Sequence, residues 1–427
     1  MAAELANVEQ YLKVKFGPAI IKQLQNETPI RQEFLADKSQ SWSGSEVSYP
    51  VHVNRNRGVM ATAENGSLPT AGAQQLEKWH IPLRFIHGRV QFTGQALKLS
   101  ESNQGAWART MTLEMEGLVD DLRQQCEFYY CGTGNGVRAL LNGDPGTGLT
   151  YTLDSPGGVS GTTHGNRYLN VGDYVAVVSP LGVLRAGGTR LITAINAAGT
   201  TATVSAAIDT LTEDNDFVVK AYGSDASLTI QNTEYQHPPM GMLGLIDDGT
   251  YVDTFHGISR SAYPIMRSPV IASVGGLSLD ILQRGFDLAE QLGSAKISAL
   301  WCHHSVRRAY LALLEADRRY LGSDLLSPDG GTKAVKGKDI GFGSVPVKTA
   351  AQFPYGTIIG LDKRYLVRYV NTEGEWMNED GNILSRVSGF DAFEGTYRLF
   401  ENNHNDRPNA SFRLDGITAS ITVAHIV

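Results

Sequence analysis

The stretch that decides the fold is WARTMTLEMEGLVDDLRQQCEFYYCGTGNG, residues 107–136. Its large apolar residues recur at steps of three or four, which keeps them on one face of an α-helix. The pattern predicts a helix over 102–130, with Ser102 as N-cap and the glycines of 132–136 as its stop. At about 1.5 Å per residue, this helix would be roughly 44 Å long. A helix of that length predicts a structural spine, and its apolar stripe comprises Trp107, Met111, Met115, Leu118, Leu122, Cys126 and Tyr129.

Two alternating apolar runs precede this helix. Residues 46–53 (EVSYPVHV) and 80–92 (HIPLRFIHGRVQF) are predicted to be partner strands. The 26 mostly small and polar residues between them form an unusually long connection for a compact domain. Two interpretations stay open: a surface loop without a role, or a two-stranded arm that reaches onto a neighbouring subunit. Residues 1–36 are predicted to form two short helices lying on another surface.

Residues 137–235 differ in character from the rest of the chain. Short β-type runs at 171–180, 189–195, 201–208 and 215–223 are separated by turn sequences, and periodic helix formers are nearly absent. This pattern predicts a small antiparallel β-domain, a barrel or a sandwich, inserted into a larger fold.

The remainder of the chain mixes helices and strands. Residues 278–292 are predicted to form an amphipathic helix with Ser278 as N-cap, and 297–302 and 305–316 to form a buried strand followed by a helix. A polar, glycine-rich loop is expected at 322–343. This order predicts an α+β domain, with further strands at 344–350, 356–362, 364–370 and 411–427.

The stretch WCHHSVRR, residues 301–308, is the strongest candidate for a reactive centre. Adjacent histidines at 303 and 304 would point to opposite faces of a strand and so do not bind one metal together. Ser305 stands where a helix N-cap is expected, and Arg307 and Arg308 would face solvent or a neighbour. These features favour the join between a strand and a helix over a catalytic site.

Other chemical motifs are equally weak. GTGNG at 132–136 follows a helix instead of a strand, so it lacks the context of a nucleotide-binding loop. TEDNDF at 212–217 lacks the glycine and distal glutamate of a calcium loop and is better explained as a β-turn. No nucleophile elbow or zinc-protease motif occurs. We therefore expect no enzyme activity, no cofactor and no metal.

Composition further limits the class of protein to which the chain can belong. The net charge is −7 and no run of basic residues occurs, which argues against tight, sequence-specific DNA binding. The three cysteines are too few and too widely spaced for a disulfide framework. No signal peptide and no run of 18 apolar residues is present. These features predict a protein that folds in a reducing cytoplasm.

The order of these elements resembles the major capsid protein of tailed double-stranded DNA phages, the Hong Kong 97 type of fold. Four stretches carry the resemblance: FYYCGTGNGV (128–137), PPMGMLGLIDDGTYVDTFHGISRS (238–261), ALWCHHSVRRAYLAL (299–313) and DRRYLGSDL (317–325). The resemblance covers nearly the whole chain except about 137–235. The family prototype also carries a long N-terminal scaffolding segment, whereas here only about 36 residues precede the extended loop.

The resemblance implies a specific division of the chain. The chain would comprise an N-terminal arm (1–45), an extended two-stranded loop (46–92), a peripheral domain with the spine helix (93–136), the inserted β-domain (137–235), a return to the peripheral domain (236–270) and an axial domain with C-terminal strands (271–427). Lys78 and Lys98 flank the extended loop, but nothing selects a pair for covalent cross-linking.

The resemblance also implies assembly of many copies into pentamers and hexamers of an icosahedral virion shell, formed in the host cytoplasm. Expected partners are a separate scaffolding protein, a portal, a decoration protein and packaged DNA in non-specific contact, with no membrane. The hinge candidates are Gly132, Gly134 and Gly136. The subunit-interface candidates are Arg55, Arg57, Glu64, Lys78, Trp79, Arg307, Arg308, Arg318 and Arg319.

Two alternatives stay open. The same fold would serve an encapsulin-type compartment that encloses enzyme cargo. A different class, a glycan-binding or hydrolytic tail protein, would be built on β-domains and would form trimers or fibres instead of shells.

Overall fold

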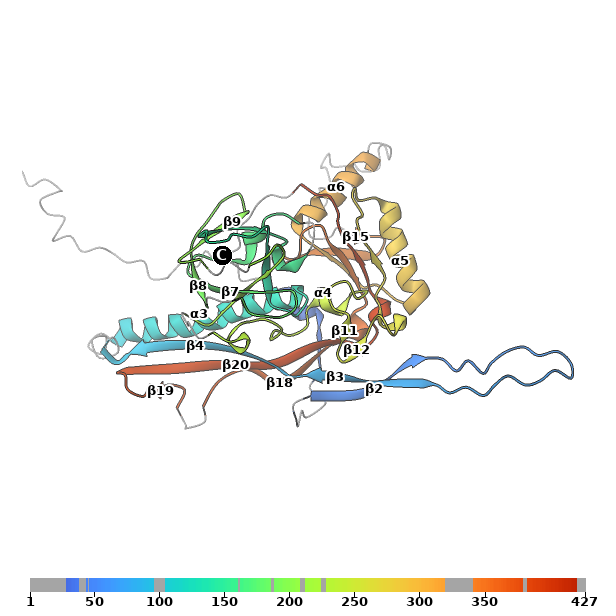
Figure 1. The fold of residues 1–427 in the computed structure, drawn as a ribbon, viewed down its shortest axis with the longest axis horizontal. Coiled ribbons are helices and arrows are strands. Elements are labelled where there is room, and N and C mark those ends of the chain that lie inside the picture. Colours follow the sequence, from blue (N-terminus) through green and yellow to red (C-terminus); the bar gives the residue numbers. More distant parts are fainter. Residues whose placement is uncertain are drawn as a thin grey trace, which may run out of the picture.

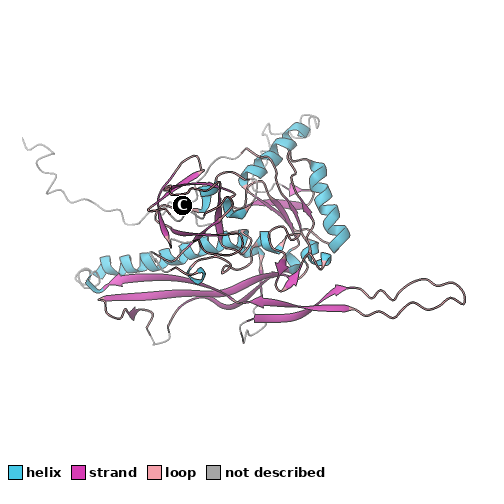
Figure 2. Ribbon diagram, in the orientation of Figure 1, coloured by secondary structure: helices cyan, strands magenta, loops and turns pink. Residues whose placement is uncertain are grey.

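The computed structural model describes residues 28–37, 44, 46–95, 104–159, 162–185, 188–207, 212–223, 228–318, 341–378 and 382–420. The molecule is elongated, with a long sheet and one long helix along its length (Figures 1 and 2). A closed barrel lies above the helix, and a second sheet with two helices lies beside the barrel. A two-stranded hairpin projects beyond the body at one end (Figure 1).

The spine helix α3 spans Gln104–Cys131, which confirms the helix predicted over 102–130. Leu122, Cys126 and Tyr129 of the predicted apolar stripe are buried, and Leu118 is half-buried. The helix ends where the Gly132 N–H donates to the carbonyls of Phe128 and Tyr129. The predicted N-cap, residue 102, lies outside the described residues.

The long sheet is the surface on which α3 lies. Its order is β1-β18-β20-β19, and β4 pairs antiparallel with residues 392–401 of β20. A Cβ added at Gly88 of β4 would lie 3.2 Å from Leu118 of α3, so glycine lets the helix pack closely on the strand. The strands are β1 (Leu35–Asp37), β4 (Arg84–Thr93), β18 (Leu366–Trp376), β19 (Ser385–Arg386) and β20 (Ala392–Asn405).

The strand predicted over 80–92 is in fact two strands in two sheets, which corrects the predicted pairing. β2 (Glu46–Asn54) pairs antiparallel with β3 (Gln75–Pro82), whereas β4 pairs with β20. Pro82 has no N–H to continue the ladder, and its pairing with Glu46 is the last one of the hairpin. The connection between β2 and β3 is therefore residues 55–74.

The two short helices predicted within 1–36 lie mostly outside the described residues. Where the structure describes this segment, Arg31–Glu33 form a 3-10 helix and Leu35–Asp37 form β1, parallel to β18. The Ile30 N–H donates to the Glu127 carboxylate of α3 at 2.9 Å. The end of the arm is thus attached to the spine helix.

The segment from 137 to 220 forms a closed barrel in the order β10-β5-β6-β9-β8-β7. Four of its strands fall within the predicted runs, whereas β5 and β6 were not predicted. Asp216 N–H donates to the Glu213 carbonyl, so TEDNDF is a turn as expected. The strands are β5 (Val137–Leu141), β6 (Thr150–Asp154), β7 (Tyr174–Val178), β8 (Arg190–Ile195), β9 (Thr201–Val204) and β10 (Phe217–Lys220).

One arginine fastens the barrel to the body. Arg167, in the connection between β6 and β7, is 2% exposed and donates to the carbonyls of Phe353 and Ala351. Its guanidinium lies 4.1 Å from the ring centre of Tyr355. The Tyr168 hydroxyl donates to the Gln352 carbonyl at 2.8 Å. The barrel therefore has a fixed position against residues 351–355.

The second sheet has the order β13-β21-β17-β14-β16-β15 and packs with α5 (Leu279–Gly293) and α6 (His304–Arg318). The predicted loop at 322–343 lies mostly outside the described residues. Between barrel and sheet, the chain forms α4 (Met242–Leu245), β11 (Thr254–Phe255) and β12 (Ile258–Ser259). The sheet strands are β13 (Val270–Ile271), β14 (Ala299–Cys302), β15 (Gly341–Phe342), β16 (Val345–Thr349), β17 (Ile358–Leu361) and β21 (Phe412–Leu414).

The N-cap of α6 differs from the prediction. The helix begins at His304, so His303 takes the cap position: its Nδ1 accepts from the Ser305 N–H at 3.1 Å, and its carbonyl accepts from the N–H groups of Val306 and Arg307. Burial lowers the pKa of His303 to about 2, which keeps this nitrogen free to accept. WCHHSVRR is thus a strand-to-helix join, as expected, with a histidine cap in place of the serine.

The predicted N-cap of α5 is confirmed, because the Ser278 side chain accepts from the Ile281 N–H at 3.2 Å. Replacing Ser278 with alanine is expected to lower the free energy of unfolding by about 1 kcal/mol. A urea titration of the unassembled subunit measures this loss. Ser278→Asp retains an accepting oxygen and should restore most of the stability; equal losses in both variants would contradict the capping role.

Candidate assembly surface

The hairpin β2–β3 and its loop form the most prominent exposed feature. The loop, residues 55–74, extends away from the rest of the chain (Figure 1). Three of its apolar side chains are largely exposed: Val59 by 84%, Met60 by 62% and Leu68 by 86%. A single subunit gains nothing from exposing these side chains, and large apolar side chains gathered on one projecting loop favour a site of interaction.

The hairpin base is held by aromatic packing within the chain. Tyr49 of β2 and Trp79 of β3 meet edge to face at 5.0 Å between ring centres, and Trp79 meets His404 of β20 at 4.5 Å. Trp79 is only 2% exposed. The side chain of this predicted interface residue therefore packs inside its own subunit, where it anchors the hairpin, and it is not offered to a neighbour.

The other hairpin candidates are all exposed. Arg55, Arg57 and Glu64 are exposed in the loop, and Lys78 is exposed on β3. A role for these four residues in contacts between copies stays a prediction.

The candidates of α6 lie on a different part of the molecule from the hairpin (Figure 1). Arg307 donates to the Thr349 hydroxyl at 3.3 Å, and Arg308 donates to the Ser420 carbonyl at 2.7 Å. The side chain of Arg318 and all of Arg319 lie outside the described part of the chain. The predicted interface residues thus form two separate groups.

The hinge candidates differ in their surroundings. Gly134 and Gly136 have φ angles of +88° and +75°, which side-chain-bearing residues rarely adopt. A Cβ at Gly136 would lie 2.3 Å from the Glu234 carbonyl oxygen. Glycine is therefore required at these positions by local geometry. Gly132 ends the spine helix without a positive φ, and hinge motion at all three stays a prediction.

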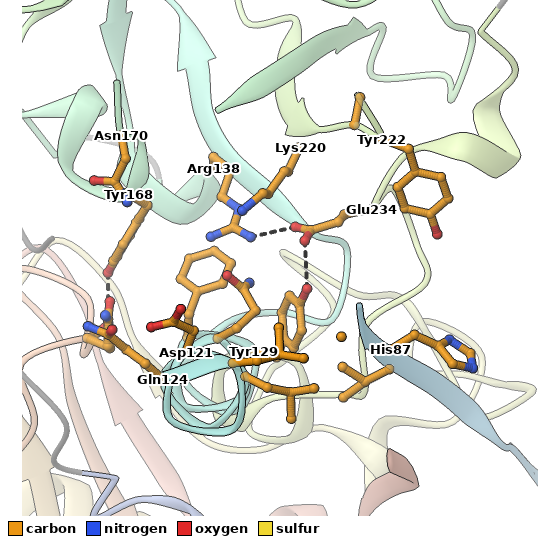
Figure 3. A pocket seen from close by; sticks show the side chains of 18 residues that line it. His87, Asp121, Gln124, Tyr129, Arg138, Tyr168, Asn170, Lys220, Tyr222 and Glu234 are labelled. Carbon is orange, nitrogen blue, oxygen red and sulfur yellow. Dashed lines mark hydrogen bonds and ion pairs between the residues drawn. The ribbon is translucent and has the colours of Figure 1, made fainter. Parts of the chain in front are cut away.

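Sequence reasoning missed a buried ion pair of the barrel segment that also binds a tyrosine of the spine helix. Arg138 of β5 donates to Glu234 at 2.6 Å, and the Tyr129 hydroxyl of α3 donates to the same carboxylate at 2.7 Å (Figure 3). Burial, reinforced by the Glu234 charge, raises the pKa of Tyr129 well above its usual value. Arg138 and Glu234 are 96 residues apart, and no spacing in the sequence pairs them.

This ion pair borders a cavity of about 550 Å³ between α3, β4 and the barrel (Figure 3). Asp121 and Gln124 reach it from the helix, and Tyr168, Asn170 and Lys220 reach it from the barrel. Its size falls in the range of ligand pockets, roughly 300–1,000 Å³. The cavity and the hairpin are the two surfaces best suited to bind another molecule.

In the part of the chain that the structure describes, no three His, Cys, Asp or Glu side chains gather as a metal site. The three cysteines are buried, and burial raises the pKa of the Cys302 thiol to about 12, which disfavours a reactive thiolate.

Over the described ranges, none of the helices combines the length and the apolar character needed to span a membrane.

No protein-family model and no curated protein matches this sequence. In structure, the chain is similar to capsid chains. It resembles a chain of the cyanophage A-1(L) capsid asymmetric unit with a TM-score of 0.58 and 11% identity, over 96% of this chain and 98% of that one. It resembles a chain of the capsid of the native GTA particle with a TM-score of 0.50 and 11% identity, over 98% and 99%. The chain therefore has the mixed α+β fold of phage-type capsid chains.

Proposed function

We propose that this chain is the major capsid protein of a tailed double-stranded DNA phage. Its fold would be of the Hong Kong 97 type, with the barrel of residues 137–235 as an inserted domain. The observation that carries the proposal is the similarity to the cyanophage capsid chain over almost the full length of both chains. The function itself is assembly into pentamers and hexamers that enclose DNA, without a catalytic step.

The distribution of exposed apolar side chains supports assembly. Val59, Met60 and Leu68 lie on the hairpin loop, whereas Met377, Ile383 and Phe390 lie near the far ends of β18 and β20. These two groups are at opposite ends of the elongated molecule (Figure 1). Unlike surfaces at opposite ends favour head-to-tail contacts, which close into rings when the rotation between copies is right.

The proposed partners follow from this role. The arm (1–45), the extended loop (46–92) and the spine region (93–136) would contact neighbouring copies, and Arg55, Arg57, Glu64 and Lys78 are proposed for these contacts. A separate scaffolding protein, a portal and a decoration protein would complete assembly in the host cytoplasm. The net charge of −7 suits a container that touches DNA without binding it tightly.

Electron microscopy of the purified full-length chain tests the proposal. We expect isometric shells or capsomer rings. Discrete trimers or fibres, or a monomer under every assembly condition, would overturn it. An encapsulin-type compartment is separated by the content of particles made in infected cells, because a capsid contains genome-length DNA and a compartment contains cargo enzyme.

Replacing Val59, Met60 and Leu68 together by serine is expected to abolish shell formation and to leave the subunit folded. These side chains are exposed, so each substitution should change the free energy of unfolding by about 0.5 kcal/mol or less. Sedimentation of assembled particles measures the first effect and urea unfolding the second. Leu292→Ser, at an exposed residue of α5, is the control and should assemble normally. Normal assembly of the triple variant would contradict the role of the loop.

A further inference from the structure

A second, smaller pocket lies near the base of the hairpin, between β3, β4 and the turn that joins β11 to β12 (Figure 1). Its volume is about 190 Å³, below the roughly 300–1,000 Å³ of pockets for larger ligands, so it suits a small ion. The His80 N–H of β3 donates to the His256 carbonyl at 2.8 Å, which holds the turn against the strand at this point. The pocket thus lies where separate parts of one chain meet.

Arg84 brings an unpaired positive charge to this pocket. Among the arginines that the structure describes as half-buried or buried, Arg84 alone has no hydrogen-bond or ion-pair partner. Burial lowers the pKa of its guanidinium, and no carboxylate offsets this effect. Burial acts on Arg138 in the same sense, but the charge of Glu234 more than offsets it, and the pKa of Arg138 is raised. A cation that has lost water without gaining a counter-charge is unfavourable, and an anion would relieve it.

The other polar groups of the pocket also favour an anion. None of the described residues that line it is an aspartate or a glutamate. Thr254 is exposed, and its hydroxyl has no partner among the described contacts, so it is available to donate. His80 interacts through Nδ1 with the Glu46 carboxylate at 3.1 Å, which leaves Nε2 available to donate when the ring is protonated. The pocket therefore offers donors from three segments.

The charges behind the pocket do not cancel that of Arg84. Burial lowers the pKa of His256, and the charges of Arg260 and Arg84 lower it further, so both guanidinium groups act on this imidazole. Arg260 lies 3.5 Å from the Asp247 carboxylate, which neutralises it. Arg84 has no such partner, and its charge acts in a partly buried site where water screens it less.

We propose that this pocket, the Arg84 pocket, binds a small tetrahedral oxyanion of the phosphate class. The Arg84 guanidinium donates parallel hydrogen bonds to two of its oxygens, a geometry that phosphate matches, and the Thr254 hydroxyl donates another. The bound ion joins β4 to the turn after β11 and stabilises the hairpin base within one subunit. A small ion suits a chain of net charge −7 better than a polyanion does.

Calorimetric titration of unassembled subunits with sodium phosphate, with chloride added to hold the ionic strength constant, tests the site. We expect saturable binding of one phosphate per subunit. Arg84→Gln should weaken binding by about tenfold or more, because hydrogen bonds from a charged donor are lost. The matched control is Arg89→Gln on the same strand: Arg89 is exposed and pairs with Glu394, so this variant should bind phosphate as wild type does.

Stability provides a second readout. Without phosphate, Arg84→Gln should unfold at the same urea concentration as wild type or at a higher one, because the substitution removes a charge that has no partner. Phosphate well above its Kd should raise the unfolding midpoint of wild type and of Arg89→Gln, and it should leave that of Arg84→Gln unchanged. A role of Arg84 in folding alone would give the opposite result without phosphate.

Several results would overturn the site: no saturable binding to wild type, equal Kd values for wild type and Arg84→Gln, or equal weakening by Arg84→Gln and Arg89→Gln. If Arg84→Gln does not fold, Thr254→Val decides, because Thr254 is exposed. This variant should bind phosphate more weakly than wild type, and an unchanged Kd would overturn the site.

A short DNA duplex tests the identity of the ligand. At constant ionic strength, the duplex should not displace phosphate from wild-type subunits. Displacement would assign the pocket to the backbone of a nucleic acid and overturn the proposed ligand. Every measurement uses single subunits, so the result does not depend on whether the chain assembles into shells.

Discussion

Replacing Asp247 with alanine is expected to destabilise the subunit by about 3–5 kcal/mol, the usual result of removing one partner from a buried ion pair. Asp247 is fully buried, after α4, and lies 2.9 Å from Arg413 of β21 and 3.5 Å from Arg260. Both arginines are also buried. Without the carboxylate, the guanidinium groups of Arg260 and Arg413 stay buried and lose the negative charge that Asp247 supplies.

The same carboxylate also organises the backbone around it. Its Oδ2 accepts from the N–H groups of Gly249, Tyr251 and Val252 at 3.2, 3.0 and 2.8 Å. These contacts fix the turn that leads from α4 toward β11, which lies close to the hairpin base. The alanine variant therefore loses a charge pair and a turn at once.

Urea unfolding of unassembled subunits measures this effect. Asp248→Ala is the matched control: Asp248 lies next to Asp247 but accepts only from Thr250 in the described contacts. We expect a loss of about 1 kcal/mol or less for this control. Equal midpoints for the two variants would mean that the buried network does not stabilise the fold.

The second large effect is a dependence on pH that comes from the histidines at the hairpin base. His404 is fully buried among Tyr49, Trp79, Phe255 and Tyr369, and neither of its ring nitrogens has a hydrogen-bond partner. Burial lowers its pKa well below the usual value, and the charge of nearby His256 adds to this. Burial lowers the pKa of His256 to about 3.

The lowered pKa values determine whether stability rises or falls with pH. A histidine whose pKa is lower in the folded chain binds fewer protons there than in the unfolded chain, so stability falls as the pH drops below about 6.5. Between pH 6.5 and 4.5, protonation of His404 in the unfolded chain should lower the free energy of unfolding, by about 2 kcal/mol at most. Glu127 acts in the opposite sense, because burial raises its pKa to about 7 and favours the fold toward acid pH.

A comparison with His404→Phe isolates the contribution of His404. At pH 7.5 the two proteins should differ by less than about 1.5 kcal/mol, because the phenyl ring fits the aromatic cluster and no ring hydrogen bond is lost. At pH 4.5 the stability of the variant relative to wild type should be higher than at pH 7.5, by up to about 2–3 kcal/mol. A difference that stays constant with pH would show that the Asp406 carboxylate, 3.4 Å from Nε2, compensates the charged ring.

The sequence predicted the elements whose side chains follow a clean period. The spine helix and α5 were located within two residues, because their apolar faces pack on the body of the same chain. The strands β7 to β10 were likewise located, because buried residues alternate with exposed ones or run continuously in a closed barrel. The local sequence pattern is enough to predict a helix or strand where buried residues recur at the period of that element.

The longest strand, β20, escaped prediction because its second half is polar and yet buried. Glu401, Asn402, Asn403 and Asn405 are 0–1% exposed, and the first three have partners in distant parts of the chain. Glu401 pairs with Arg31 and Arg368 at 3.1 Å, and the Asn402 side chain donates to the Pro82 carbonyl at 2.6 Å. No local sequence pattern predicts the burial of polar groups whose hydrogen bonds and ion pairs come only from tertiary contacts.

The candidate assembly surface was predictable only in part, because burial of its residues also depends on tertiary contacts. Arg55 and Arg57 are exposed in the loop, and their role in contacts between copies stays a prediction. Trp79 is instead buried, since it packs against His404 from β20. The cavity was not predicted at all. It exists only because α3, β4 and the barrel meet, and each contributes one wall.

The barrel begins and ends at one place: Val137 of β5 lies directly opposite Val219 of β10. Neighbouring strands are about 4.8 Å apart, so a very short linker spans the gap if the barrel is cut out of the gene. Conversely, any foreign domain whose termini are adjacent can be spliced in at this position. A particle built from this chain would then carry one copy of the guest on every subunit, at a defined spacing.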